Sequence, residues 1–299
     1  MSKLSFYHLF ANGDDSVNFI VSHGDFVYQF NLVAICSYRT GVKVAAFSIE
    51  ETHPHFLLYG DAGGVSEFME MYKRSTIRHI SATRGSADGV VLDLECCEID
   101  NQNYLMNVAS YVVVQSTKDG KPVMFYDYKW GSGSLYFRSG KHIPIWQIGD
   151  SGGLKDVRRL ADLNSRERVA VCGRHLLPEN WFVCDNLILP TNYVDVDMFE
   201  GIFWTHNCFR VFVGSSNKQY DHVRETMASA RGVELNDYEA RELVSLLCLE
   251  HYNTKDIRSV DSSARLHLAL AMKNQYRMSC RQLAAICRLP ESELRKYYK

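Results

Sequence analysis

The chain has 299 residues, 46% of them hydrophobic and 23% charged, with only 6 Pro, which excludes a disordered, collagen-like or disulfide-stapled protein. Its net charge of −2 is uneven, because residues 251–299 carry ten Lys and Arg against four Asp and Glu, a net +6 that leaves −8 on residues 1–250. No apolar run reaches the ~20 residues that span a bilayer, no secretory signal opens the chain and no C-x-x-C pair occurs, so we expect an intracellular, cytoplasmic protein without a membrane partner or a structural zinc site.

The first hundred residues show strands and helices in alternation. Hydrophobic patterning predicts strands over residues 4–10, 42–50, 55–60 and 90–99, with a turn at 12–15. It predicts helices over residues 23–39, starting at the Ser22–Asp25 turn, and over residues 65–80. A further amphipathic helix is expected over 155–169, and three or four helices follow residue 217. The sequence therefore predicts an α+β domain over 1–138, a connecting region over 139–216 and an all-helical tail over 217–299.

His53 and His55 form an H-x-H motif in the segment ETHPHFLLY. In an extended chain, side chains two residues apart project from the same face, so both imidazoles can meet one metal ion. With 11 His in the chain, two ordinary surface or core histidines are the simpler interpretation of this motif alone.

Tyr111 is followed four residues later by Gln115. On a helix the two side chains share a face and lie about 6 Å apart along the axis, whereas on a strand they would be about 13 Å apart. Local propensity favours a strand, because residues 112–114 are all Val. Taken by itself, Tyr111 is equally an ordinary packed aromatic.

The order of these motifs resembles the single-tyrosine HUH transposases, of the insertion-sequence and REP-associated types. The resemblance rests on the first strand and turn, the H-x-H strand end, the tyrosine helix with Tyr104 upstream of Tyr111, and the segment YDYKWGSGSLYF. It covers residues 5–138, and more weakly the segment from NYVDVDMFEGIFW to Phe212. The resemblance implies an antiparallel sheet with helices on one face, of the ferredoxin-like kind, and places Tyr111 on a helix.

The resemblance also implies an activity and its residues. His53, His55 and the side-chain oxygen of Gln115 would bind Mg²⁺ or Mn²⁺, and Tyr111 would attack a DNA phosphate to leave a 5′-phosphotyrosine. We expect cleavage and rejoining of single-stranded or hairpin DNA, by a monomer or a homodimer that associates with the nucleoid when bound to DNA. Tyr7, Phe10 and Phe56 are expected to line the site. The alternative is a domesticated relative that binds hairpin DNA without cutting it efficiently.

Several residues depart from the family pattern. Pro54 stands where the family has a bulky apolar residue, Thr52 where Asn is more usual, and Gln115-Ser116 where Asn-Pro is usual. Because proline cannot donate to a sheet ladder, we expect the strand to be unpaired or bulged at Pro54.

The end of the chain has the spacing of a helix-turn-helix. Ser279 is predicted to cap a first helix that carries Leu283 and Ile286, Leu289-Pro290 would form the turn, and residues 291–299 the second helix. A solvated helical hairpin without a DNA role is the competing interpretation. The polar residues expected to reach phosphates or base edges are Arg281, Gln282, Ser292, Arg295 and Lys296.

Overall fold

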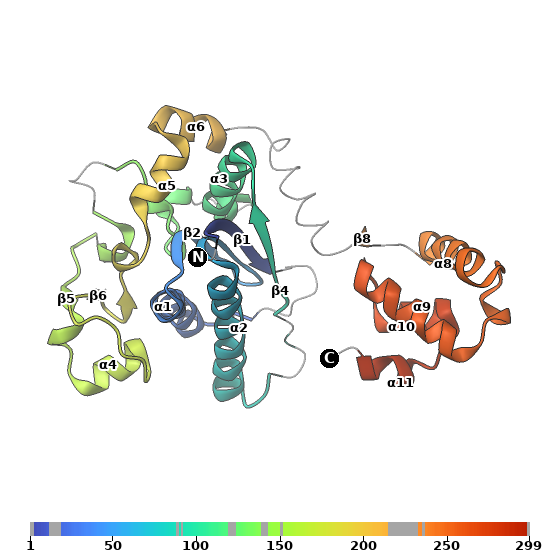
Figure 1. Cartoon of the computed structure of the whole chain (residues 1–299). Coiled ribbons are helices and arrows are strands. Elements are labelled where there is room, and N and C mark those ends of the chain that lie inside the picture. Colours follow the sequence, from blue (N-terminus) through green and yellow to red (C-terminus); the bar gives the residue numbers. More distant parts are fainter. Residues whose placement is uncertain are drawn as a thin grey trace. The chain divides into compact units, whose positions relative to one another are not determined.

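The chain divides into two compact units, Met1–Val223 and Arg224–Lys299. The first unit contains a sheet and helices, and the second is mainly helical (Figure 1). The computed structural model describes residues 3–11, 19–87, 90, 92–118, 124–138, 143–149, 152–214, 233–234 and 237–297. The predicted turn at 12–15 lies outside these residues.

A four-stranded antiparallel sheet forms the centre of the first unit, in the order β2-β3-β1-β4. Its elements follow the chain as β-α-β-β-α-β, and a third helix comes after the last strand. The four strands and two helices predicted for the first hundred residues are confirmed. The bounds are β1 Ser5–Ala11, α1 His23–Thr40, β2 Lys43–Ile49, β3 Pro54–Gly60, α2 Ala62–Arg84, β4 Leu94–Ile99 and α3 Gln102–Lys118.

Helices cover both faces of the sheet, so the expectation of helices on one face is wrong. Phe56 of β3 packs against Phe68 and Tyr72 of α2, with ring centroids 5.7 and 5.1 Å apart. The preceding residue, His55, points to the opposite face. There its ring lies 5.4 Å from that of Tyr111 on α3. The alternation of β3 therefore sends its apolar side chains toward α2 and His55 toward α3.

Helix α3 spans the residues for which local propensity favours a strand. Its N-terminal end is capped by Asn101, whose side-chain oxygen accepts the Tyr104 N–H at 3.1 Å. Val108, Ala109 and Val112 are fully buried. Burial of this apolar face against the sheet outweighs the preference of Val for strands, as tertiary packing commonly outweighs local propensity.

The start of α1 is fixed by a buried carboxylate. Ser22 caps the helix in a capping box with Asp25, and the Asp25 carboxylate lies 2.8 Å from His79 Nε2 and 3.3 Å from Arg84 Nη2 on α2. Burial alone would raise the pKa of Asp25, but the bonds from the Val21 N–H, His79 and Ser22 and the charge of Arg84 lower it below its usual value.

Replacing Asp25 by Ala is expected to lower the free energy of unfolding by about 2–4 kcal/mol, because a buried partner of an ion pair is removed. A lowered folded-state pKa means that this stabilisation is present above the unfolded pKa of about 3.9 and is lost as the pH falls from there through the folded value. Urea unfolding at neutral and acidic pH measures both effects. Asp156→Ala, at an exposed site, should stay within about 0.5 kcal/mol of the parent, and an equal loss there would contradict the assignment.

The segment that follows α3 runs beside β2. Ser132 N–H donates to Phe47 O at 2.9 Å, Ile49 N–H donates to Trp130 O at 2.9 Å, and the Tyr136 hydroxyl donates to Ala45 O at 2.6 Å. These bonds satisfy backbone groups on the outer edge of β2.

The predicted helix over 155–169 is wrong. Val157–Arg159 forms strand β5, which pairs with β6, and the helix begins only after Asn164, whose side chain accepts the N–H groups of Arg166 and Glu167. Two features therefore determine where this helix begins. Residues 157–159 pair with a strand distant in the sequence, and Asn164 is a strong N-cap. The remaining elements of this unit are α4 Ser165–Cys172, β6 Phe182–Cys184, β7 Leu187–Ile188, α5 Val196–Phe203 and α6 His206–Gly214.

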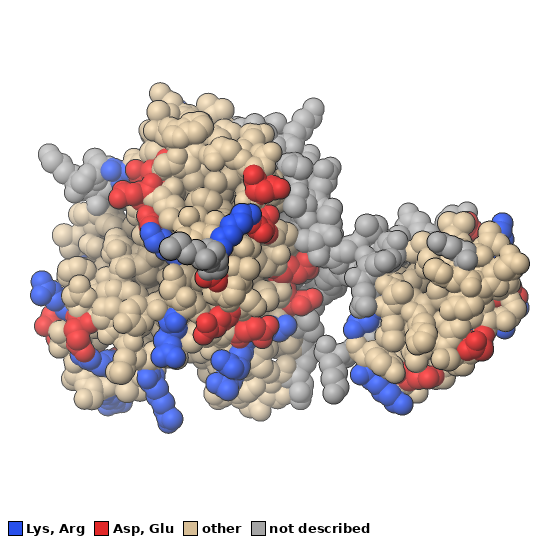
Figure 2. Space-filling model, in the orientation of Figure 1, with Lys and Arg blue, Asp and Glu red and all other residues tan. Residues whose placement is uncertain are grey.

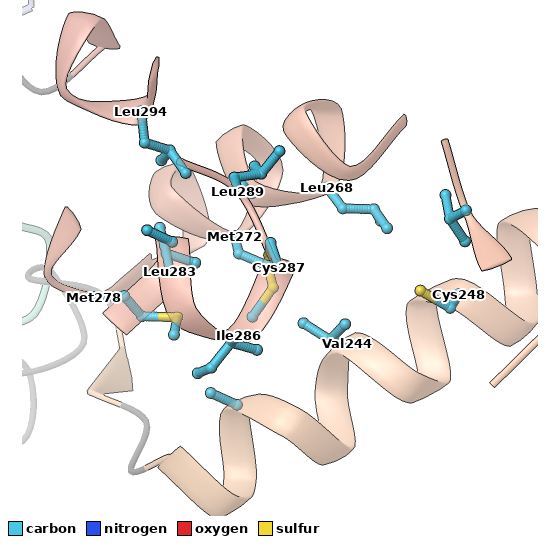
Figure 3. Close-up of a cluster of buried hydrophobic side chains, with 14 of the residues drawn as sticks. Val244, Cys248, Leu268, Met272, Met278, Leu283, Ile286, Cys287, Leu289 and Leu294 are labelled. Atoms are coloured by element: carbon cyan, nitrogen blue, oxygen red, sulfur yellow. The ribbon is translucent and has the colours of Figure 1, made fainter. Parts of the chain in front are cut away.

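The second unit is a small helical domain with its own apolar core. Its elements are β8 Val233–Glu234, α8 Asp237–Tyr252, α9 Ser262–Gln275, β9 Tyr276–Arg277, α10 Cys280–Cys287 and α11 Glu291–Leu294. Figure 3 shows side chains from α8, α9 and α10 converging on this core. The labelled members include Val244, Leu268, Met272, Leu283 and Ile286.

The predicted cap at Ser279 is confirmed, since its hydroxyl accepts the Gln282 N–H at 3.1 Å. The predicted second helix is shorter than expected. It consists of α11, a single turn, followed by a 3₁₀ turn over Arg295–Tyr297. Within residues 291–297, Leu294 alone is buried, and one apolar anchor supports little helix.

Charges are interspersed on the first unit. On the face shown in Figure 2, Lys and Arg alternate with Asp and Glu, and the described residues of that face form no broad basic surface. Within the described part of the chain, no helix is both long and apolar enough to cross a bilayer.

Candidate metal and tyrosine site

His53 and His55 meet at the start of β3. Their ring centroids lie 5.0 Å apart and the rings are perpendicular. Pro54, between them, is the first residue of β3 and pairs in register with Ile49, without a bulge. The ladder to β1 begins only at His55, opposite Phe10, so the missing N–H of Pro54 costs no bond on that side. The expected bulge at Pro54 is therefore absent, and the strand is unpaired there only on the β1 side. The two imidazoles come close together at this end of the strand.

Gln115 reaches His53 from α3. Its Nε2 lies 3.2 Å from His53 Nε2, and His53 Nδ1 lies 2.8 Å from the Thr52 hydroxyl. In this orientation of the Gln115 amide, its donor Nε2 faces His53 Nε2, and the two contacts of His53 fit a ring protonated on Nδ1 that donates to the Thr52 hydroxyl. Rotating the Gln115 amide by 180° would place its Oε1 where Nε2 lies.

Tyr111 lies one helical turn before Gln115, above the two strands that carry histidine. Its ring centroid is 5.4 Å from that of His55 and 6.1 Å from that of His8 on β1. The structure therefore brings together Tyr111, His53, His55 and Gln115, although 62 residues separate His53 from Gln115. Tyr111, Gln115 and His55 are only 5%, 7% and 1% exposed, whereas His53 is half-buried. The solvent side of the site is thus at His53.

His8 is a third histidine of the site, and the sequence interpretation missed it. It is fully buried, and its Nε2 lies 3.3 Å from His55 Nδ1. If His55 binds a cation through Nε2, its Nδ1 carries the proton and donates to His8, which fixes the ring as carboxylates and carbonyls do at other metal sites. The only signal in the sequence was one polar residue inside an apolar strand.

Replacing His8 by Ala is expected to weaken Mn²⁺ binding about 10–100-fold, because His55 loses the partner that orients its ring. Electron paramagnetic resonance titration of free Mn²⁺ measures this without any activity. His8→Gln keeps an acceptor oxygen near Nδ1 and should restore part of the affinity. If both variants bind Mn²⁺ as the parent does while remaining folded, His8 has no positioning role.

A buried carboxylate supports the turn that carries His53. Glu50 is 1% exposed and accepts bonds from the hydroxyls of Ser48 at 2.9 Å and Tyr128 at 3.2 Å. Its backbone N–H donates to His53 O at 3.0 Å. Tyr128 comes from the segment YDYKWGSGSLYF, so this segment contributes to the framework of the site.

The donor set at this point is two imidazoles and one amide. Among the described residues, no three His, Cys, Asp or Glu side chains gather into a metal-binding group, so a cation here would depend on Gln115 as its third protein ligand. Imidazole nitrogen and amide oxygen are suitable donors for Mn²⁺ and, less well, for Mg²⁺. The contact between His53 and Gln115 shows that these side chains reach a common point.

Of the three aromatics expected to line the site, Phe10 lies against it, with its ring centroid 4.8 Å from that of His8 and 6.4 Å from that of His55. Phe56 instead packs against α2 on the opposite face of the sheet, and Tyr7, Phe10 and Phe56 are all buried, at 7%, 0% and 0% exposure. A different aromatic cavity, of about 480 Å³, opens between the segment after α3 and helix α6. Its lining includes Tyr126, Phe137, Arg138, His206 and Arg210.

Strain and stacking mark this aromatic cavity. Phe137 has a left-handed backbone (φ 53°), and its N–H donates to Glu200 at 2.5 Å. Its ring stacks on His206 at 5.6 Å, and the Arg138 guanidinium lies 4.8 Å from the Tyr126 ring centroid. Aromatic faces beside arginines are features of surfaces that hold unstacked bases.

The five predicted DNA contacts of the tail lie on three elements. Arg281 and Gln282 are on α10, Ser292 is on α11, and Arg295 and Lys296 are in the 3₁₀ turn. Gln282 is half-buried and the other four are exposed. Arg295 is bound to Glu291, with Nη2 and Oε1 2.9 Å apart, so its charge is already compensated.

Comparison with models of known protein families and with curated proteins finds no match to this chain. The function of the site is therefore argued from its geometry and chemistry.

Proposed function

We propose that the chain cleaves and rejoins single-stranded DNA through a covalent bond to Tyr111. The observation that carries this proposal is the convergence of Tyr111, His53, His55 and Gln115 from two separate elements at one point. The order β2-β3-β1-β4 supports it, since it is the order of the ferredoxin-like β-α-β-β-α-β sheet that the resemblance to single-tyrosine HUH transposases implies.

In the proposed reaction, Tyr111 is the nucleophile and the other three residues are the metal ligands. The Tyr111 oxygen attacks phosphorus and forms a new O–P bond, while the bond to the 3′ oxygen breaks. The phenol loses a proton and the 3′ oxygen gains one, which leaves a 5′-phosphotyrosine and a free 3′-OH. His53, His55 and Gln115 would hold Mn²⁺ or Mg²⁺, which when bound polarises the phosphate and stabilises charge on the leaving oxygen. Because the phosphotyrosine retains the bond energy, a later 3′-OH can rejoin the strand without ATP.

A single strand fits this site better than a duplex. The catalytic groups are largely buried, so a flexible backbone must enter past His53, the half-buried member. The aromatic cavity at Tyr126 and Phe137 offers unstacked bases a surface on the same unit. Both features favour a strand whose bases are free.

The test is a denaturing gel of the chain with hairpin strands labelled at either end, in Mn²⁺, Mg²⁺ or EDTA. Attack by Tyr111 leaves the downstream fragment on the protein, so a strand labelled at its 3′ end should give a labelled covalent band. The same strand labelled at its 5′ end should release a short free fragment instead. A covalent band from the 5′ label, or one that persists in EDTA, would contradict the proposed chemistry.

A hairpin-binding protein without cleavage is the alternative, and the burial of Tyr111 is the observation that favours it. It predicts retarded DNA on a native gel and no covalent band in any metal.

A further inference from the structure

The second unit contains a small pocket between α8, the turn at 255–258 and α10. Its volume is about 190 Å³, enough for a phosphate group. Four of the lining residues are cationic and only Asp256 is acidic. The cationic residues are Arg241, Lys255, Arg258 and Arg288.

These four cations are available to a ligand. All are exposed, and in the described part of the chain no ion pair joins any of them to a carboxylate. The carboxylate of Asp256 accepts the backbone N–H of Arg258 at 3.0 Å, which occupies it within its own turn. The hydroxyl of Ser245 donates to Lys255 O at 3.2 Å and ties the turn to α8.

Arg288 occupies a backbone conformation that favours glycine. It ends α10 with φ 55° and ψ 44°, and its carbonyl accepts a bond from Arg265 Nη1 at 2.9 Å. A residue with a Cβ is disfavoured in this left-handed region. The chain nevertheless places a guanidinium there, at the edge of the pocket, and such outliers concentrate at functional positions.

Residues 291–297, next to this pocket in the sequence, are electrically neutral by comparison. Residues 291–297 carry Glu291 and Glu293 against Arg295 and Lys296, and Arg295 is paired with Glu291. On α10, by contrast, Arg281, Ala285 and Arg288 follow one another at helical spacing on one exposed face. Cationic side chains at both ends of this face flank a small residue that permits close approach.

We propose that this pocket binds a phosphate of a nucleic-acid backbone, and that the α10 face at Arg281 and Arg288, rather than the turn at 295–297, is the main contact of the second unit. Four uncompensated cations around one cavity match a phosphodiester better than an apolar or cationic ligand. The inference rests on the proposed function only for the choice of nucleic acid as the partner. It does not depend on cleavage at Tyr111.

The test uses the full chain with Tyr111→Phe in EDTA, so that cleavage plays no part, and measures fluorescence anisotropy of a labelled hairpin strand over a series of salt concentrations. The pair Arg258→Gln with Arg288→Gln is expected to weaken binding about tenfold and to reduce the slope of log K against log salt by about 2. The matched pair Arg295→Gln with Lys296→Gln removes the same charge from the neighbouring turn. It should change the slope by less than half as much.

The variant Arg288→Gly distinguishes an effect on DNA binding from an effect on folding stability. Glycine relieves the left-handed strain, so this variant should unfold at a higher temperature than the parent while binding the hairpin more weakly. Loss of binding together with a lower unfolding temperature would show that Arg288 acts on structure alone and would overturn its assignment to the ligand.

Two other results would overturn the proposal. Equal slopes for the two pairs would mean that no particular site in the second unit contacts phosphate. If pyrophosphate raises the unfolding temperature of the parent but not of the Arg258 and Arg288 pair, while hairpin binding is the same in both, the pocket serves a free anion rather than DNA.

Discussion

Tyr111→Phe is expected to abolish the covalent protein–DNA band and to slow strand cleavage by at least about 10³-fold, as loss of a nucleophile does elsewhere. The substitution removes one oxygen and keeps the ring that packs against His8 and His55 at 6.1 and 5.4 Å. The fold and the metal ligands should therefore be unchanged, and the unfolding temperature and Mn²⁺ affinity should equal those of the parent.

Tyr104→Phe is the matched control, because Tyr104 lies on the same helix and is also buried, at 8% exposure against 5% for Tyr111. It should form the covalent band at the parental rate. Digestion of the adduct followed by mass spectrometry should place the nucleotide on the peptide that contains Tyr111. A persistent adduct in Tyr111→Phe would assign the nucleophile to another residue.

The sheet and its two flanking helices could be predicted from the sequence because their signals are local. A strand can be recognised from alternating or wholly apolar residues. The start of α1 can be recognised from its cap, Ser22, followed three residues later by Asp25. Neither pattern depends on contacts with distant parts of the chain. The helix over 155–169 failed for the opposite reason. Whether residues 157–159 form a strand depends on pairing with 182–184, which periodicity cannot reveal.

In the candidate site, too, some residues could be identified from the sequence and others only from the fold. The spacing of His53 and His55, and of Tyr111 and Gln115, is visible along the chain, but the choice of helix for Tyr111 came from a resemblance and not from propensity. His8 became visible only when β1 was placed beside β3, because register brings it to His55 from 47 residues away. The aromatic cavity at Phe137 was equally hidden, since α6 contributes four of its nine lining residues.

His53→Ala should weaken Mn²⁺ binding by at least about 100-fold, more than the loss of an outer partner such as His8, because a ligand itself is removed. His53 is the half-buried member, so Ala at this position disturbs packing less than it would at His55. Titration calorimetry with Mn²⁺ measures the change, and His251→Ala, at an exposed position on α8, is the control that should bind as the parent does.

Gln115→Glu should act in the opposite direction and tighten Mn²⁺ binding, because a carboxylate adds charge to a site whose other donors are neutral. Gln115→Leu, which keeps an apolar stem one bond shorter than that of Gln and removes the oxygen, should weaken binding as His53→Ala does. Opposite effects of Glu and Leu at one position would be difficult to attribute to folding. Parental Mn²⁺ affinity in all three variants would mean that these side chains form a buried hydrogen-bond network and not a metal site.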